Sequence, residues 1–279
     1  MTPDTTQSLE IRIADGVARV ALNRVAVHNA FDDALIGELT QCMRTLDTDR
    51  NVRVVVLQGN GASFCAGADL SWMRRMSQYD YHENLADANA LAAMLAAIAN
   101  VAKPVLARVH GAAFGGGVGL IACCDIAVGT PRATFALSEA RLGLIPSTIG
   151  PYVVRAIGTR AAQRYFLSGE RFDAAEALRI GLLHEVAADD ALDARIDAIV
   201  DALLRAGPAA QAAAKDLLRA ISGGPIDAAM IADTARRIAD VRASAEAREG
   251  LAAFLDKRAP AWSAHLPPHH LPPRARNPR

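Results

Sequence analysis

Two glycine-rich segments hold residue types from which a site for a negatively charged oxygen could be built. Residues 64–70 read Phe-Cys-Ala-Gly-Ala-Asp-Leu, and a second segment holds the run Gly115-Gly116-Gly117. Small residues let the backbone approach a ligand closely, and free N–H groups at a helix start attract an oxyanion. Two such donors that meet on one oxygen form an oxyanion hole. The same residue types also suit tight turns and helix packing, which is their commoner use.

Glu139 and Cys65 are the side chains that could do chemistry beside these segments. Glu139 follows the apolar run 134–137, so it could line a pocket or pair with a nearby arginine at the surface. Cys65 has no histidine close in the sequence to activate it. We therefore predict that Cys65 is a buried structural thiol rather than a nucleophile.

Several known catalytic signatures are broken in this sequence. A dinucleotide loop that begins at Gly115 would need glycine where Leu120 stands, and a serine elbow at Ser63 would need glycine where Cys65 stands. There is no GxxxxGK[ST] and no HExxH pattern. The histidines near the C-terminus fall among prolines, so a solvated end is expected there rather than a metal site. No metal site is predicted.

Composition narrows the class of protein. The chain has 279 residues, 52% of hydrophobic types, with 30 basic residues balanced by 30 acidic ones. Zero net charge argues against a dedicated nucleic-acid binder. The four cysteines form no CxxC pair, which favours reduced thiols. The N-terminus lacks a basic, apolar leader and no apolar run is long enough to span a membrane. We expect a cytoplasmic protein without a membrane segment.

Hydrophobic periodicity predicts an α/β fold in the first part of the chain. A hairpin is expected where residues 9–13 and 17–22 alternate about Asp15-Gly16. A helix should start at Asp32 or Asp33. Further strands are predicted at 52–57, 105–109, 125–128 and 134–137, and further helices at 81–100 and 118–123. Strands that alternate with helices indicate crossover connections.

Beyond about residue 150 the sequence becomes alanine-rich and helical in period. Helices are predicted within 159–168, 173–180, 189–205, 208–221 and 226–257, with one short strand at 182–186. We predict a core over residues 1–200 and a helical region over 201–262. Residues 263–279 are rich in proline and are predicted to be a disordered tail.

Taken in order, these segments resemble the crotonase, or enoyl-CoA hydratase/isomerase, superfamily. At position 25, within the first of these segments, this chain has valine where the family usually has proline. The resembling segments are Leu22-Asn23-Arg24 with Asn29-Ala30, residues 64–70, residues 110–117, Cys124-Asp125-Ile126, residues 142–146 and residues 254–258.

The resemblance implies a spiral of ββα turns with a helical C-terminal trimerisation region, assembled as a trimer or hexamer. It implies that the N–H groups of Ala68 and Gly116 hold the thioester oxygen of an acyl-CoA, with Glu139 as the acid–base group. No cofactor is implied beyond the CoA thioester substrate. Residues implied to bind the substrate are Ala66, Asp69, Leu70 and Ser71, together with Phe254 and Lys257, which would reach the CoA of a neighbouring subunit.

One departure leaves the reaction open. Hydratases of this family use two glutamates, and the first of them is replaced here by Gly119. Isomerases of the family use only the glutamate that corresponds to Glu139. The segments 68–73, 117–120 and 137–146 are similar to bacterial methylglutaconyl-CoA and isohexenylglutaconyl-CoA hydratases. This predicts hydration of methylglutaconyl-CoA, in leucine degradation, or of a related branched enoyl-CoA.

Those substrates carry a distal carboxylate, for which Arg74, Arg75, Arg141 and Arg155 are candidate partners. The alternatives are an enoyl-CoA isomerase, a non-catalytic acyl-CoA-binding scaffold and an RNA-binding protein. The neutral charge disfavours the last of these, and intact oxyanion segments disfavour the scaffold.

Overall fold

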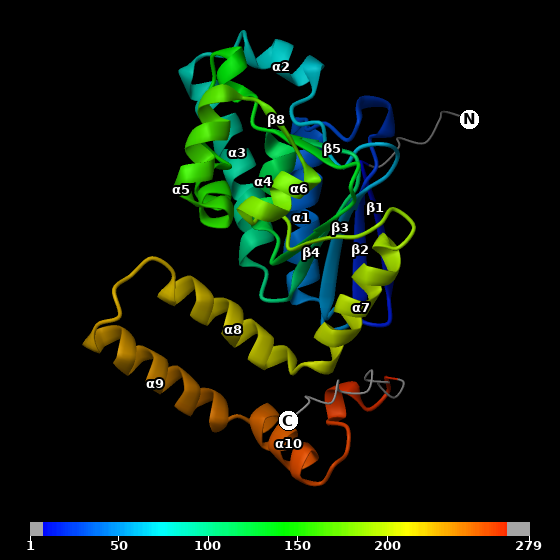
Figure 1. The fold of residues 1–279 in the computed structure, drawn as a ribbon, viewed down its shortest axis with the longest axis vertical. Helices are drawn as coiled ribbons and strands as arrows, with labels where there is room; N and C mark the ends of the chain where they lie inside the picture. Colours follow the sequence, from blue (N-terminus) through cyan, green and yellow to red (C-terminus); the bar gives the residue numbers. More distant parts are fainter. Residues whose placement is uncertain (1–7, 267–279) are drawn as a thin grey trace, which may run out of the picture. The chain divides into compact units, whose positions relative to one another are not determined.

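The computed structural model describes residues 8–266, so most of the predicted tail lies outside the described residues. The chain forms two compact units, Met1–Leu203 and Leu204–Arg279. Below they are called the first and the second unit, and each is described by itself (Figure 1).

The first unit begins with the predicted hairpin. β1 (Leu9–Ala14) pairs with β2 (Val17–Leu22) across a turn in which Asp15 and Gly16 have φ angles of 50° and 80°. The strands β3 (Val54–Gly59), β4 (Val105–Val109), β6 (Ile126–Gly129) and β9 (Glu185–Val186) then add in parallel. The result is a six-stranded sheet with the order β1-β2-β3-β4-β6-β9.

A second, smaller sheet accounts for the two strands in each ββα turn. It contains β5 (Ala112–Phe114), β7 (Thr134–Ala136) and β8 (Arg171–Asp173), in the order β5-β7-β8. The pair β4-β5 is followed by a helix, and so is the pair β6-β7. In each pair the first strand joins the large sheet and the second joins the small one. β7 was predicted, at 134–137, whereas β5 and β8 were not.

The helices of the first unit confirm most of the predicted segments. Asp32 caps α1 as predicted, by accepting a hydrogen bond from Leu35 N at 2.8 Å. Gly150, rather than residue 159, begins α5, so that prediction was too short. The helices are α1 (Asp33–Thr48), α2 (Leu70–Met76), α3 (Tyr81–Asn100), α4 (Gly116–Cys123), α5 (Gly150–Ser168), α6 (Ala174–Ile180) and α7 (Leu192–Arg205), which crosses into the second unit.

The core of the first unit lies between the sheets and the helices α1, α3, α4 and α5. Apolar side chains from each of these elements are fully buried, which supplies most of the driving force for folding. Examples are Leu39 and Met43 of α1, Leu95 of α3, Leu57 of β3, Phe135 of β7 and Tyr165 of α5.

The second unit is helical, as predicted. It contains α8 (Pro208–Ile221), α9 (Ala228–Arg242), α10 (Ala245–Leu255) and the 3₁₀ turn η3 (Ala261–Ser263). The segment 226–257, predicted to be helical, holds the two helices α9 and α10, because Ser244 caps a new helix start. No residue of α8 or α9 is buried.

Candidate active site

The two glycine-rich segments lie directly against each other. The N–H groups of Phe64 and Cys65 both donate to Ala112 O, and Phe114 N donates to Cys65 O at 2.9 Å. Gly67 has a φ of +91°, and a Cβ at that position would lie 3.0 Å from Phe114 O. Glycine is therefore required at 67 by both the backbone conformation and the close approach of the second segment.

Phe31 links the residues predicted to supply the oxyanion donors. Its N–H donates to Gly67 O at 2.7 Å and its carbonyl accepts from Asp69 N at 2.8 Å, so Phe31 pairs with the backbone on both sides of Ala68. Its ring lies against Gly116, where a Cβ would be 2.4 Å from Phe31 Cε2. Ala68 and Gly116 are thus brought together around one side chain that sequence reasoning missed.

The N–H groups of Ala68 and Gly116 are available for a ligand. Gly116 is the first residue of α4, a position whose N–H has no acceptor within its helix. Among residues 8–266, neither N–H donates a hydrogen bond to another protein group. That both donors bind one thioester oxygen stays a prediction.

Glu139 lies at the start of α4, although it comes from the 3₁₀ turn η2 (Glu139–Leu142) after β7. A Cβ at Gly115, the residue that precedes α4, would lie 3.1 Å from Glu139 Oε1. Gly115 has a φ of +48°, and the absence of a side chain there leaves room for the carboxylate. Glu139 and Gly116 are therefore neighbours.

Within residues 8–266 the carboxylate of Glu139 forms no ion pair with an arginine. Its Oε2 is buried and accepts no hydrogen bond from residues 8–266. Burial raises the pKa of Glu139, and its own backbone N–H offsets only part of that effect. A partly buried carboxyl with an elevated pKa beside a free backbone donor is the arrangement expected of an acid–base group.

Gly119 has no space beside it for a second carboxylate. A Cβ at this position would lie 2.3 Å from Ile149 Cγ2 and 3.6 Å from Leu95 Cδ2. Any side chain at 119 would therefore overlap Ile149 unless α5 moved. The space that a side chain at 119 would take is filled by hydrocarbon.

The other predicted substrate-binding residues are divided between the two units. Ala66 N donates to His28 O at 3.0 Å, and Leu70 is 72% exposed at the start of α2. Ser71 N is held by Asp69, whose carboxylate is buried. Phe254 and Lys257 lie in the second unit, in α10 and just after it, so their contact with a neighbouring subunit's CoA stays a prediction.

Two other expectations about side chains can be compared with the structure. Cys65 is fully buried, and burial raises its pKa to about 12, which confirms a structural thiol. Arg75 pairs with Asp33, whereas Arg74 and Arg155 form no ion pair within the described part of the chain. Among residues 8–266 no His, Cys, Asp and Glu cluster could hold a metal ion, and no helix is long and apolar enough to cross a membrane.

Comparison with known proteins identifies the family. Residues 12–265 match the family model described as enoyl-CoA hydratase/isomerase. The chain is 33% identical to the 2,3-dehydroadipyl-CoA hydratase of Escherichia coli K12, over 88% of this chain and 94% of the relative.

Solved structures of similar proteins indicate the same family. An enoyl-CoA hydratase from Shewanella pealeana is 45% identical with a TM-score of 0.90, covering 92% of this chain and 97% of that one. One from Mycobacterium smegmatis is 36% identical with a TM-score of 0.86, covering 91% and 98%. The fold is therefore the crotonase fold, and the chain belongs to the enoyl-CoA hydratase/isomerase family.

Proposed function

We propose that this protein adds water to the double bond of a branched enoyl-CoA that carries a distal carboxylate, with methylglutaconyl-CoA as the first candidate. The observation that carries the proposal is Glu139 Oε2, a buried carboxylate oxygen without a hydrogen-bond partner among residues 8–266, beside the Gly116 N–H at the start of α4. The E. coli relative supports the substrate class, because an adipyl thioester also has a distal carboxylate.

The geometry suits a single acid–base residue. As hydroxide from water bonds to the β-carbon, negative charge develops on the thioester oxygen, where the N–H groups of Ala68 and Gly116 stabilise it. Glu139 takes the proton released by that water and returns it to the α-carbon. One C–O and one C–H bond form, the carbon–carbon π bond and one O–H bond of water break, and Glu139 ends as it began.

Isomerisation is the second candidate, and the closed space at Gly119 favours it. A shift of the double bond needs one group that removes a proton at one carbon and returns it at another, and Glu139 alone supplies such a group.

The test is a panel of enoyl-CoA thioesters with products identified by mass. Methylglutaconyl-CoA is compared with an analogue that has a methyl group in place of the distal carboxylate. A gain of one water with preference for the carboxylate supports the proposal. An unchanged mass with a moved double bond would establish isomerisation instead. Turnover of neither thioester would leave only an acyl-CoA-binding scaffold.

We also propose a trimer or a dimer of trimers, with the second unit at the interface. Large apolar side chains of this unit are exposed, and a monomer would leave them in water. They are Leu218, Ile226, Ile231, Ile238, Leu251, Phe254 and Leu255. Light scattering at micromolar concentration should give a mass of three or six chains, and a monomer would contradict the proposal.

A further inference from the structure

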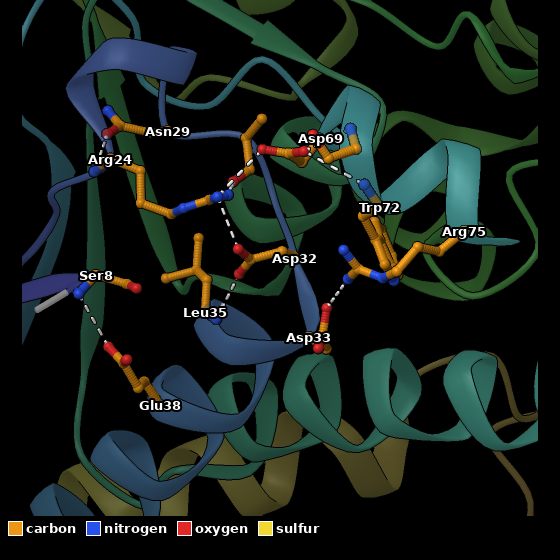
Figure 2. A network of polar contacts seen from close by, with 12 residues as sticks. Ser8, Arg24, Asn29, Asp32, Asp33, Leu35, Glu38, Asp69, Trp72 and Arg75 are labelled. Carbon is orange, nitrogen blue, oxygen red and sulfur yellow. Dashed lines mark hydrogen bonds and ion pairs between the residues drawn. The ribbon is translucent and has the colours of Figure 1, made fainter. Parts of the chain in front are cut away.

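Arg24 lies at a junction that holds the first oxyanion segment, although it contributes no atom to the predicted site. Its guanidinium donates to Ala30 O and to Asp69 Oδ2, the latter at 3.1 Å, and lies 2.7 Å from Asp32 Oδ2. The Arg24 side chain is 20% exposed, and those of Asp32 and Asp69 are 21% and 8% exposed. Figure 2 shows the guanidinium between the two carboxylates.

The three partners of Arg24 surround the pairing of Phe31 with Ala68. Ala30 and Asp32 are the two neighbours of Phe31 in the chain, and Asp69 is the residue after Ala68. The Phe31 backbone bonds to Gly67 O and Asp69 N and leaves the N–H of Ala68 free. The Arg24 guanidinium therefore binds both segments of the Phe31–Ala68 β-bridge, from which the Ala68 N–H projects.

Asp69 carries this connection into α2. Its Oδ1 accepts from Ser71 N at 2.7 Å and from Trp72 N at 3.3 Å, which caps the helix, while its Oδ2 receives Arg24. Burial on its own would raise the pKa of Asp69, but these two N–H donors and the Arg24 charge outweigh it and hold the pKa below its usual range. Asp69 thus stays ionised and needs the cation beside it.

Asn29 holds the other end of the same segment. This fully buried residue accepts from Arg24 N at 3.0 Å, and its amide donates to the carbonyls of Asn60, Ser63 and Phe64. The turn that begins at Arg24 therefore contacts the oxyanion segment before and after Ala68.

We propose that Arg24 is a positioning residue that fixes the Ala68 N–H toward the thioester oxygen, through Asp69 and the Phe31 bridge. This inference rests on the proposed function. Without the guanidinium, the carboxylates of Asp32 and Asp69 would face each other with no cation between them, and the bridge would loosen. Because donor geometry matters most as charge develops, the loss should fall on kcat more than on KM.

Arg24→Met removes the charge, and Arg24→Lys keeps it without the planar fork that reaches three acceptors. Arg108→Met is the control, because the Arg108 side chain is 19% exposed and pairs with Asp193, which is not a member of the Arg24 junction. With methylglutaconyl-CoA, kcat should fall at least about tenfold in Arg24→Met and less in Arg24→Lys, with KM changed less than about threefold. The control should stay within about twofold of the wild type.

A spectroscopic readout separates positioning from turnover. Cinnamoyl-CoA bound to a Glu139→Gln background should absorb at longer wavelength than free cinnamoyl-CoA, because the oxyanion donors polarise its carbonyl. Arg24→Met should reduce that shift and Arg108→Met should not, with folding verified by circular dichroism. If Arg24→Met does not fold, Arg24→Lys makes the same comparison.

An undiminished shift with kcat equal to that of the control would overturn the inference. A wild-type shift that Arg24→Met reduces, in a protein that turns over no enoyl-CoA, would support Arg24 while refuting the proposed function.

Discussion

The two sides of the candidate site are built in different ways. The proposed oxyanion side consists of backbone N–H groups from Ala68 and Gly116, held by hydrogen bonds and by close glycine contacts. The acid–base side consists of the Glu139 carboxylate, one of whose oxygens has no partner among residues 8–266. One side is thus fixed by the fold itself, and the other depends on a single side chain.

Two glycines of the same segment make this difference visible. Gly115 leaves space that Glu139 occupies, and Gly119, one turn later, leaves space that Ile149 occupies. The first glycine admits a carboxylate and the second admits hydrocarbon. Glycine alone therefore does not reveal what fills the space beside it.

The largest expected effect is at Glu139. Glu139→Gln keeps the size of the side chain and removes the base, so turnover should fall about 100-fold or more, while acyl-CoA affinity changes little and the variant adopts the same fold. Steady-state kinetics beside a binding titration measure both quantities. Glu170→Gln, on an exposed carboxylate paired with Arg164, is the control. Turnover close to wild type would mean that another group handles the proton.

A smaller effect, on the free energy of unfolding, is expected when glutamate replaces Gly119 beside Ile149. Gly119→Glu should lower the free energy of unfolding by about 1–3 kcal/mol, because its Cβ would overlap Ile149 and its charge would be buried without a partner. Combining it with Ile149→Ala should cost less than the sum of the two single changes, since the smaller side chain makes room.

Urea unfolding of the wild type, the two single variants and the double variant gives the coupling free energy between positions 119 and 149. Additive changes would show that Ile149 is not what closes the space. Gly37→Glu, on the exposed side of α1 where a Cβ meets nothing within 4 Å, controls for the loss of a helical glycine.

Much of the oxyanion side could be predicted from sequence. Gly67 and the glycines at 115–117 indicate positions of unusual backbone conformation or close contact, because glycine is the residue type that permits both. Asp69 directly precedes α2 and caps it, which is a common use of aspartate at a helix start. The hairpin at Asp15-Gly16 was equally clear, because turn chemistry is local.

The rest depends on contacts between residues far apart in the chain. Ile149 and Gly119 lie 30 positions apart, and Arg24 and Asp69 lie 45 apart, so no local pattern connects them. In the sequence Phe31 looks like an ordinary core residue. Only its contacts with Ala68 and Gly116 in the folded protein distinguish it from other core residues. An arginine two residues after a strand and two aspartates directly before helices were the available signals for the Arg24 junction.

The smallest expected effect is on pH dependence, and it again separates the two sides. The backbone donors do not titrate, so acid loss of activity should follow Glu139 alone. Burial raises the pKa of this carboxyl, so the ionised base is lost as pH falls through a value above the usual glutamate range. The acid limb of kcat/KM should lie correspondingly above pH 4.5, the ordinary pKa of the side chain.

The same shift has a consequence for stability with a defined sign. Because the folded protein binds this proton more tightly than the unfolded chain does, ionised Glu139 destabilises the fold above its folded-state pKa. Glu139→Gln should therefore unfold at higher urea concentration than the wild type at neutral pH. That advantage should shrink as pH falls through the folded-state pKa and vanish below the unfolded one. A variant that is less stable at neutral pH, or an advantage that does not change with pH, would show that the carboxylate is stabilised in the fold and that its pKa is not raised.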